Sequence, residues 1–149
     1  MIIDMEQMMW FTNDLSNKNP NHNYQVLAND FLEKYFKAIM MGVFYASHYY
    51  GTDSLISLRI IHNNNNVNKL FEFVGYNNFR NKLAEMNVSS ITFNNVVTTN
   101  QPLGKNNVII NFYSKAEINK AYYNVMSSIT IKISTLIPKI TNQTLQIFV

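Results

Sequence analysis

The sequence has 149 residues, a formal net charge of +3 and no cysteine, and only 14% of its residues are charged. A chain of this length is expected to form one domain whose core buries roughly two-thirds of the unfolded surface. The lack of cysteine excludes disulfides, thiolate nucleophiles and zinc sites of the cysteine type. It also favours a reducing, intracellular compartment.

Residues 1–23 are predicted to form an N-terminal arm and tether, ahead of a folded domain over residues 24–149. The arm, MIIDMEQMMWF, is apolar, and the tether, TNDLSNKNPNHN, has the composition of a loop. Asp4 and Glu6 stand where a secretory signal would carry cations, so no signal is expected. No apolar run approaches the roughly 18 residues of a membrane span. We expect the arm to pack on its own domain or a neighbour, or to serve as a docking peptide for a partner.

The clearest amphipathic helix is predicted over Tyr24–Met41. Asn23 is a candidate cap, and Gly42 is expected to end the helix in the left-handed conformation. Glu33 and Lys37 stand four residues apart, in the order that stabilises an exposed helix face. The apolar stripe recurs every three or four positions, as one face of a helix requires, and consists of Leu27, Phe31, Tyr35, Phe36, Ala38 and Ile39.

After Gly42 the pattern changes from helical to extended. Val43–Tyr50 is predicted to add one or two helical turns, and the asparagine run at 63–66 is predicted to be a surface loop. A second helix is predicted over Asn77–Met86, where apolar residues recur at helical spacing. The strands predicted from β-propensity and alternation are Leu55–Ile61, Ile91–Thr99, Val108–Ala116, Tyr122–Ile133 and Ile137–Phe148.

Both faces of the strand that begins at Val108 are partly apolar. Alternate residues fall on opposite faces of a strand, so one face carries Val108, Ile110 and Phe112, and the other Ile109, Asn111 and Tyr113. Helices can cover one face, and the second is expected to be buried against another copy of the chain. We predict a homodimer through Val108–Ala116 and Tyr122–Ile133; a heterodimer with a related chain is the alternative.

Nucleic-acid, metal and cofactor sites are not predicted. The lysines are scattered singly, without the basic stripe and interleaved aromatics of a nucleic-acid site. His22, His48 and His62 are isolated and lack the spacing of metal ligands. Turns or caps explain all four glycines, and none belongs to a phosphate-binding loop. The abundant asparagine is typical of an AT-rich genome.

Four local patterns resemble the nuclear transport factor two-like superfamily, and most of all the dimerisation domain of the stress-granule scaffold (Ras-GAP-binding) proteins. NDFLEKYFKAI carries aromatic residues at the positions of that family's first helix, and HYYGTDSLISL resembles its aromatic-Tyr-Gly turn before a strand. VGYNNFRNKL resembles its Gly-initiated helix, and VMSSITIKI followed by ITNQTLQIF resembles its last two strands. Together the patterns span residues 25–148 in the family's order.

The resemblance implies an α+β cone, in which a curved antiparallel sheet wraps around the long first helix, and a homodimer through the open face of that sheet. It also implies a hydrophobic groove for Phe-Gly-containing peptides, as in stress-granule scaffold or nuclear transport and mRNA export adaptors of the cytoplasm, nucleus or nuclear envelope. Carried over by position, the groove is lined by Phe31, Tyr49 and Leu145. Tyr49 and Leu145 replace phenylalanines of the scaffold proteins, and Gln143 replaces an acidic residue.

The same superfamily holds steroid isomerase-like and dehydratase-like enzymes, so a small-molecule enzyme is the alternative function. Such chemistry needs a buried carboxylate or histidine as base and a hydroxyl donor. The candidates are Asp30, Asp53, Tyr35 and Tyr50. Asp30 lies about 100° from Phe31 around the helix and is expected to face solvent, whereas Asp53 is expected in a turn. The sequence therefore favours a binding module with no catalytic residues.

Overall fold

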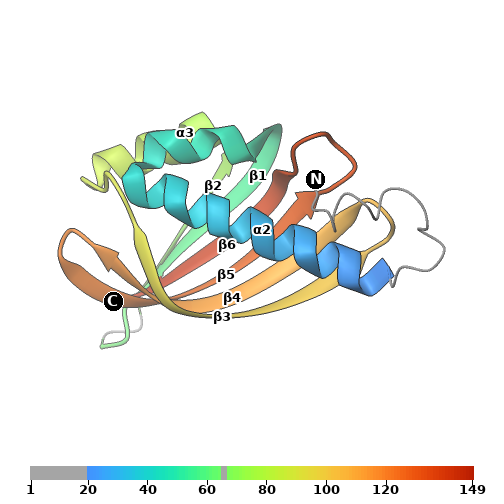
Figure 1. Cartoon of the computed structure of the whole chain (residues 1–149). Coiled ribbons are helices and arrows are strands. Elements are labelled where there is room, and N and C mark those ends of the chain that lie inside the picture. The colour runs from blue at the N-terminus through green and yellow to red at the C-terminus, as the bar shows by residue number, and fades with distance from the viewer. Residues whose placement is uncertain (1–19, 65–66) are drawn as a thin grey trace.

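The computed structural model describes residues 20–64 and 67–149, with side chains from Asn23 onward. One face of a single six-stranded sheet is covered by helices, and the strand order is β2-β1-β6-β5-β4-β3 (Figure 1). The helical elements are α2 (Pro20–Met41), the 3-10 helix η2 (Val43–Tyr49) and α3 (Tyr76–Glu85). The strands are β1 (Tyr50–Ile61), β2 (Asn68–Val74), β3 (Thr92–Leu103), β4 (Asn107–Ile118), β5 (Ala121–Lys132) and β6 (Lys139–Phe148).

The predicted α+β cone is confirmed, with one difference in the sheet. All neighbouring strands are antiparallel except β1 and β6, which run parallel with Leu58 opposite Leu145. The strands β3 to β6 form a meander of hairpins, and its last strand then inserts beside β1. The relative direction of β1 and β6 is therefore set by the course of the meander and not by a local turn between the two strands. The sequence pattern does not reveal this pairing.

Helix α2 begins at Pro20, inside the stretch predicted to be tether. Proline suits the first turn of a helix because its missing N–H would have no partner there. Asn23 therefore lies within the helix and not at its cap. Gly42 follows the helix as predicted, but its φ of 163° is extended backbone and not left-handed. The chain leaves the helix through a hydrogen bond from the Val43 N–H to the Ser89 carbonyl, 2.8 Å long.

The apolar stripe of α2 lies against the sheet, as its spacing predicts. Phe31, Tyr35 and Ile39 are buried. On the opposite side, Lys34 pairs with Asp30 at 3.0 Å, and a second i,i+4 pair joins Lys37 to Glu33 at 3.7 Å. None of the described helices combines the length and apolar character needed to cross a membrane.

Strand β2, which the sequence pattern missed, forms one edge of the sheet. It pairs with β1 so that Phe73 lies opposite Ile56. Helix α3 follows directly, and Gly75 makes the turn between them with a φ of +86° and a ψ of 144°. Residues other than glycine rarely adopt this conformation, so the turn depends on glycine. Tyr76, the first residue of α3, is thereby held in the core.

Strand β4 confirms the prediction that both of its faces are partly apolar. Val108, Ile110 and Phe112 are buried on the face that α2 covers. Tyr113 points the other way and is exposed. No helix among the described residues covers this second face, so the sheet has a covered inner face and an open outer face (Figure 1).

Candidate binding surfaces

Two of the three predicted groove residues are in contact. Phe31 projects from the apolar stripe of α2, and Tyr49 is the last residue of η2. Their ring centroids are 5.7 Å apart with an interplanar angle of 83°. This edge-to-face arrangement is favourable because the positive edge of one ring meets the negative face of the other.

The third predicted groove residue, Leu145, lies on the inner face of β6, opposite Leu58 on β1 and Ser127 on β5. Leu145 and Phe31 are each only 3% exposed, and both belong to the hydrophobic core. Tyr49 is half-buried. Tyr49 is therefore the most accessible of the three predicted groove residues.

A closed ring of three hydrogen bonds joins α2, β1 and β6 in the core. The Tyr50 hydroxyl donates to Oε1 of Gln143, and Nε2 of Gln143 donates to the Tyr35 hydroxyl at 3.3 Å. Each tyrosine has one hydroxyl hydrogen. Because that of Tyr50 is used on Gln143, the 2.8 Å contact between the two phenolic oxygens has Tyr35 as its donor. The two hydroxyls and the glutamine oxygen thus satisfy one another.

A third tyrosine extends this network. The ring of Tyr76 stacks on that of Tyr50 with centroids 4.2 Å apart, and its hydroxyl donates to the Val43 carbonyl. Burial raises the pKa of Tyr35, Tyr50 and Tyr76 above the ordinary tyrosine value, because a phenolate would lose its hydration in the core. The three hydroxyls are therefore neutral at physiological pH.

The four groups considered for catalysis do not assemble into an acid–base site. The side chain of Asp30 is 55% exposed in its pair with Lys34. Asp53 is exposed too, and it lies in β1 and not in the predicted turn. Tyr35 and Tyr50 donate to groups within the ring. Within the described part of the chain, no three histidine or acidic side chains gather as a metal ion would require.

The open face carries a polar row that crosses the sheet and is uncharged except for one carboxylate at its β2 end. The strand registers place one residue from each strand side by side in this row. Its members, from β2 to β3, are Glu72, Ser57, Thr144, Ser128, Asn111 and Thr99. The next row contains the apolar Val97, Tyr113 and Met126 on β3, β4 and β5. It continues with Gln146 on β6, Arg59 on β1 and Leu70 on β2.

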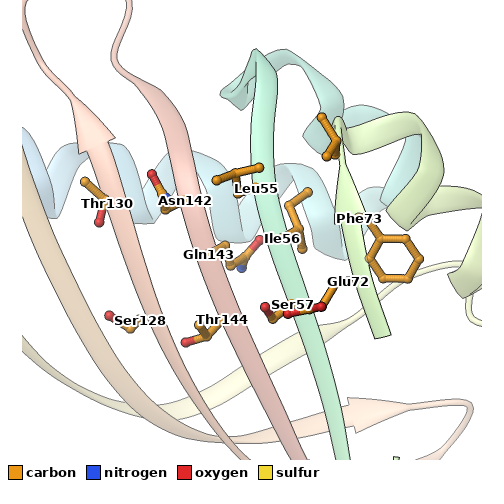
Figure 2. A pocket seen from close by; sticks show the side chains of 11 residues that line it. Leu55, Ile56, Ser57, Glu72, Phe73, Ser128, Thr130, Asn142, Gln143 and Thr144 are labelled. Atoms are coloured by element: carbon orange, nitrogen blue, oxygen red, sulfur yellow. The ribbon is translucent and has the colours of Figure 1, made fainter. Parts of the chain in front are cut away.

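Two hollows lie along this polar row. The larger, about 570 Å³, lies over β5, β6, β1 and β2, where the short side chains Ser57, Ser128 and Thr144 stand near the taller Leu55 and Glu72 (Figure 2). The smaller, about 330 Å³, is lined by residues of β3 to β6, among them Tyr113 and Met126. Short polar residues between taller side chains give the face relief into which a partner's side chains can fit.

Sequence reasoning missed the role of Gln143. The family resemblance marks Gln143 only as a departure from an acidic residue of the scaffold proteins. Its hydrogen-bond partners, Tyr50 and Tyr35, lie 93 and 108 positions away in the chain. The local signal that was available is one amide in an otherwise apolar alternation on β6, with Leu145 and Ile147 following on the same face. A buried polar residue in such a pattern indicates a hydrogen-bonded partner across the core.

A long helix lying in a curved six-stranded sheet, with the other face of the sheet open, defines the nuclear transport factor 2-like fold. Solved structures with this arrangement are similar to the chain at low sequence identity. Nuclear transport factor 2 of Cryptosporidium parvum matches with a TM-score of 0.63 and 16% identity, over 83% of this chain and 93% of that one.

Two further structures have comparable similarity. The yeast Ubp3-associated protein Bre5, which is also seen in a complex with the deubiquitinase Ubp3, matches with a TM-score of 0.59 and 11% identity, over 83% of this chain and 95% of Bre5. A protein assigned as the β subunit of an aromatic-ring-hydroxylating dioxygenase from Novosphingobium aromaticivorans matches with a TM-score of 0.58 and 11% identity, over 88% of this chain and 93% of that one. No protein-family model and no curated protein matches the chain.

These similarities establish the fold. The matching structures include both a transport factor and a dioxygenase subunit. The fold therefore leaves binding and catalysis open, and the choice between them depends on this chain's own residues.

Proposed function

We propose that the protein is a non-enzymatic dimerisation and protein-binding module. The observation that carries this proposal is the open face of the sheet, where Val97, Tyr113 and Met126 are 68%, 51% and 44% exposed. They lie next to one another in one cross-strand row. An apolar cluster on a sheet face that no described helix covers is typical of an interface.

The partner on this face is a second copy of the chain. The central polar row is uncharged over five strands, so two such faces can approach along this row without burying like charges. Hydroxyl and amide groups in the row can pair across the interface, and the apolar row beside it supplies buried area. A stable homodimer needs about 1,000 Å² of total buried surface or more.

We propose a groove at Phe31, Tyr49 and Leu145 as the module's second surface, with short Phe-containing peptides as its ligands. Tyr49 is half-buried, and Phe31 already meets it edge-to-face. A phenylalanine of the ligand would extend this stack and bury a large apolar area. The protein would then act as an adaptor, or as a competitor, for such motifs in the cytoplasm or nucleus.

Binding is favoured over catalysis by the closed ring of Tyr35, Tyr50 and Gln143. An active site of the isomerase type needs a hydroxyl that is free to donate to the substrate and a base beside it. Both tyrosine hydroxyls donate within the ring, and the two carboxylates considered are exposed.

Titration with Phe-Gly peptides tests the groove. Saturable binding to the wild type is expected, and Tyr49→Ala should weaken it about tenfold or more, the effect of losing an aromatic anchor. Tyr45→Ala is the matched control, because Tyr45 is an exposed tyrosine of the same 3-10 helix outside the groove. No saturable binding, or equal affinity of Tyr49→Ala and wild type, would refute peptide docking and leave a dimerisation domain.

A further inference from the structure

The end of α2 and the start of η2 expose four large apolar side chains around one turn of the chain. Met40, Met41, Phe44 and Tyr45 are 48%, 69%, 62% and 53% exposed. We call these four residues the η2 patch. They lie within six consecutive positions, on either side of the bend at Gly42.

The η2 patch differs from the rest of the exposed surface of α2. The other exposed residues of this helix, from Asn23 onward, are polar or charged: Gln25, Asn29, Asp30, Glu33, Lys34 and Lys37. Within the patch, the ring centroids of Phe44 and Tyr45 are 5.7 Å apart, and the guanidinium of Arg80 lies 5.3 Å from the Phe44 ring centroid. The patch is therefore apolar with a cation at its border.

We propose that the N-terminal arm, residues 1–11, binds the η2 patch of its own chain. Residues 1–19 lie outside the described part of the structure; the sequence of the arm and its attachment at Pro20 support the proposal. The arm contains four methionines together with Trp10 and Phe11, and flexible thioether side chains adapt to irregular apolar surfaces. Its charged residues, Asp4 and Glu6, are both acidic and complement Arg80.

The length of chain before Pro20 permits this contact. The distance from Pro20 to Met40 along α2 is about 30 Å at 1.5 Å per residue. Trp10 precedes Pro20 by ten residues, and ten extended residues span up to about 33–36 Å. The tether can therefore carry Trp10 to the near edge of the patch, with the earlier arm residues extending over Phe44.

Trp10 is the only tryptophan in the protein, so intrinsic fluorescence reports on the arm alone. The wild type is expected to show a blue-shifted emission maximum and slow quenching by iodide. Phe44→Ser should shift the emission to the red and raise the quenching constant towards that of free N-acetyltryptophanamide. Because Phe44 is exposed, circular dichroism and melting temperature should not change; Met41→Ser provides a second test at the same patch.

Leu136→Ser is the control, since Leu136 is a fully exposed apolar residue in the loop between β5 and β6. This variant should leave Trp10 emission as in the wild type. The proposal is overturned if wild-type Trp10 is quenched like the free compound, or if Leu136→Ser and not Phe44→Ser changes its emission. If the protection of Trp10 from iodide disappears on serial dilution, the arm binds a second copy of the chain, and the proposal of binding within one chain is overturned.

Discussion

The phenolic oxygens of Tyr35 and Tyr50 lie 2.8 Å apart, 15 positions from each other in the chain. Gln143 closes the ring with both of them. Tyr35 belongs to α2, Tyr50 begins β1 and Gln143 lies in β6, so the ring fixes the helix over the one parallel pair of the sheet. It also leaves neither hydroxyl hydrogen free for a ligand.

Tyr35→Phe should destabilise the fold by about 1–3 kcal/mol, because it removes the acceptor of Gln143 Nε2 and the donor to the Tyr50 oxygen in the core. Urea unfolding measures the difference. Tyr45→Phe is the control: Tyr45 is exposed, and its loss of a hydroxyl should change stability by less than about 0.5 kcal/mol. Equal stability of Tyr35→Phe and wild type would show that the ring adds nothing to stability.

Stability should fall steeply at high pH. Burial raises the pKa of Tyr35, Tyr50 and Tyr76 in the folded state, whereas the unfolded chain releases these protons near the ordinary value of about 10. The unfolded state then binds fewer protons than the folded state, so the stabilisation is complete below about pH 10 and is lost as the pH rises further.

Urea midpoints measured from neutral pH to about pH 11 give the slope of folding stability against pH, since ordinary tyrosines titrate within that interval. Tyr50→Phe should reduce the slope, because one buried hydroxyl is removed. A Tyr50→Phe profile that runs parallel to the wild type above pH 10 would refute the assignment.

Neighbouring residues of β4 should respond in opposite ways. Phe112 is buried against Phe36 and Phe93, with ring centroids 5.1 and 5.3 Å away, so Phe112→Ala should cost about 3–5 kcal/mol of folding stability. Tyr113 lies on the open face, and Tyr113→Ala should cost less than about 1 kcal/mol in the monomer while weakening self-association. Urea unfolding at low concentration and sedimentation separate the two effects. A larger loss of folding stability in Tyr113→Ala would contradict the assignment of faces.

Much of the fold follows from local pattern. The alternation Val108, Ile110, Phe112 predicted the covered face of β4, and the spacing of Phe31, Tyr35 and Ile39 predicted the inner side of α2. Both patterns involve neighbours in sequence, and burial imposes their period directly. Strand β2 was missed because Lys69 and Glu72 interrupt its short apolar run after the asparagine loop, although Phe71 and Phe73 alternate as a strand requires.

The sites depend on contacts that no local pattern contains. Gln143 meets Tyr35 across 108 positions, so neither residue alone indicates the ring. The polar row on the open face depends on the register of all six strands, because a shift of one residue would send a strand's side chains to the other face. For Phe31, Tyr49 and Leu145, the resemblance supplied the prediction, and their role in binding remains a prediction.

The solution mass of the wild-type protein tests the central claim, dimerisation through the open face, most directly. Light scattering at tens of micromolar should give twice the 17.3 kDa of one chain. Met126→Lys should give the monomer mass, because it would bury an unpaired charge at the centre of the interface. Leu136→Lys, which adds the same charge in an exposed loop, should remain dimeric. A wild-type mass of one chain, or a Met126→Lys protein that stays dimeric, would contradict the account.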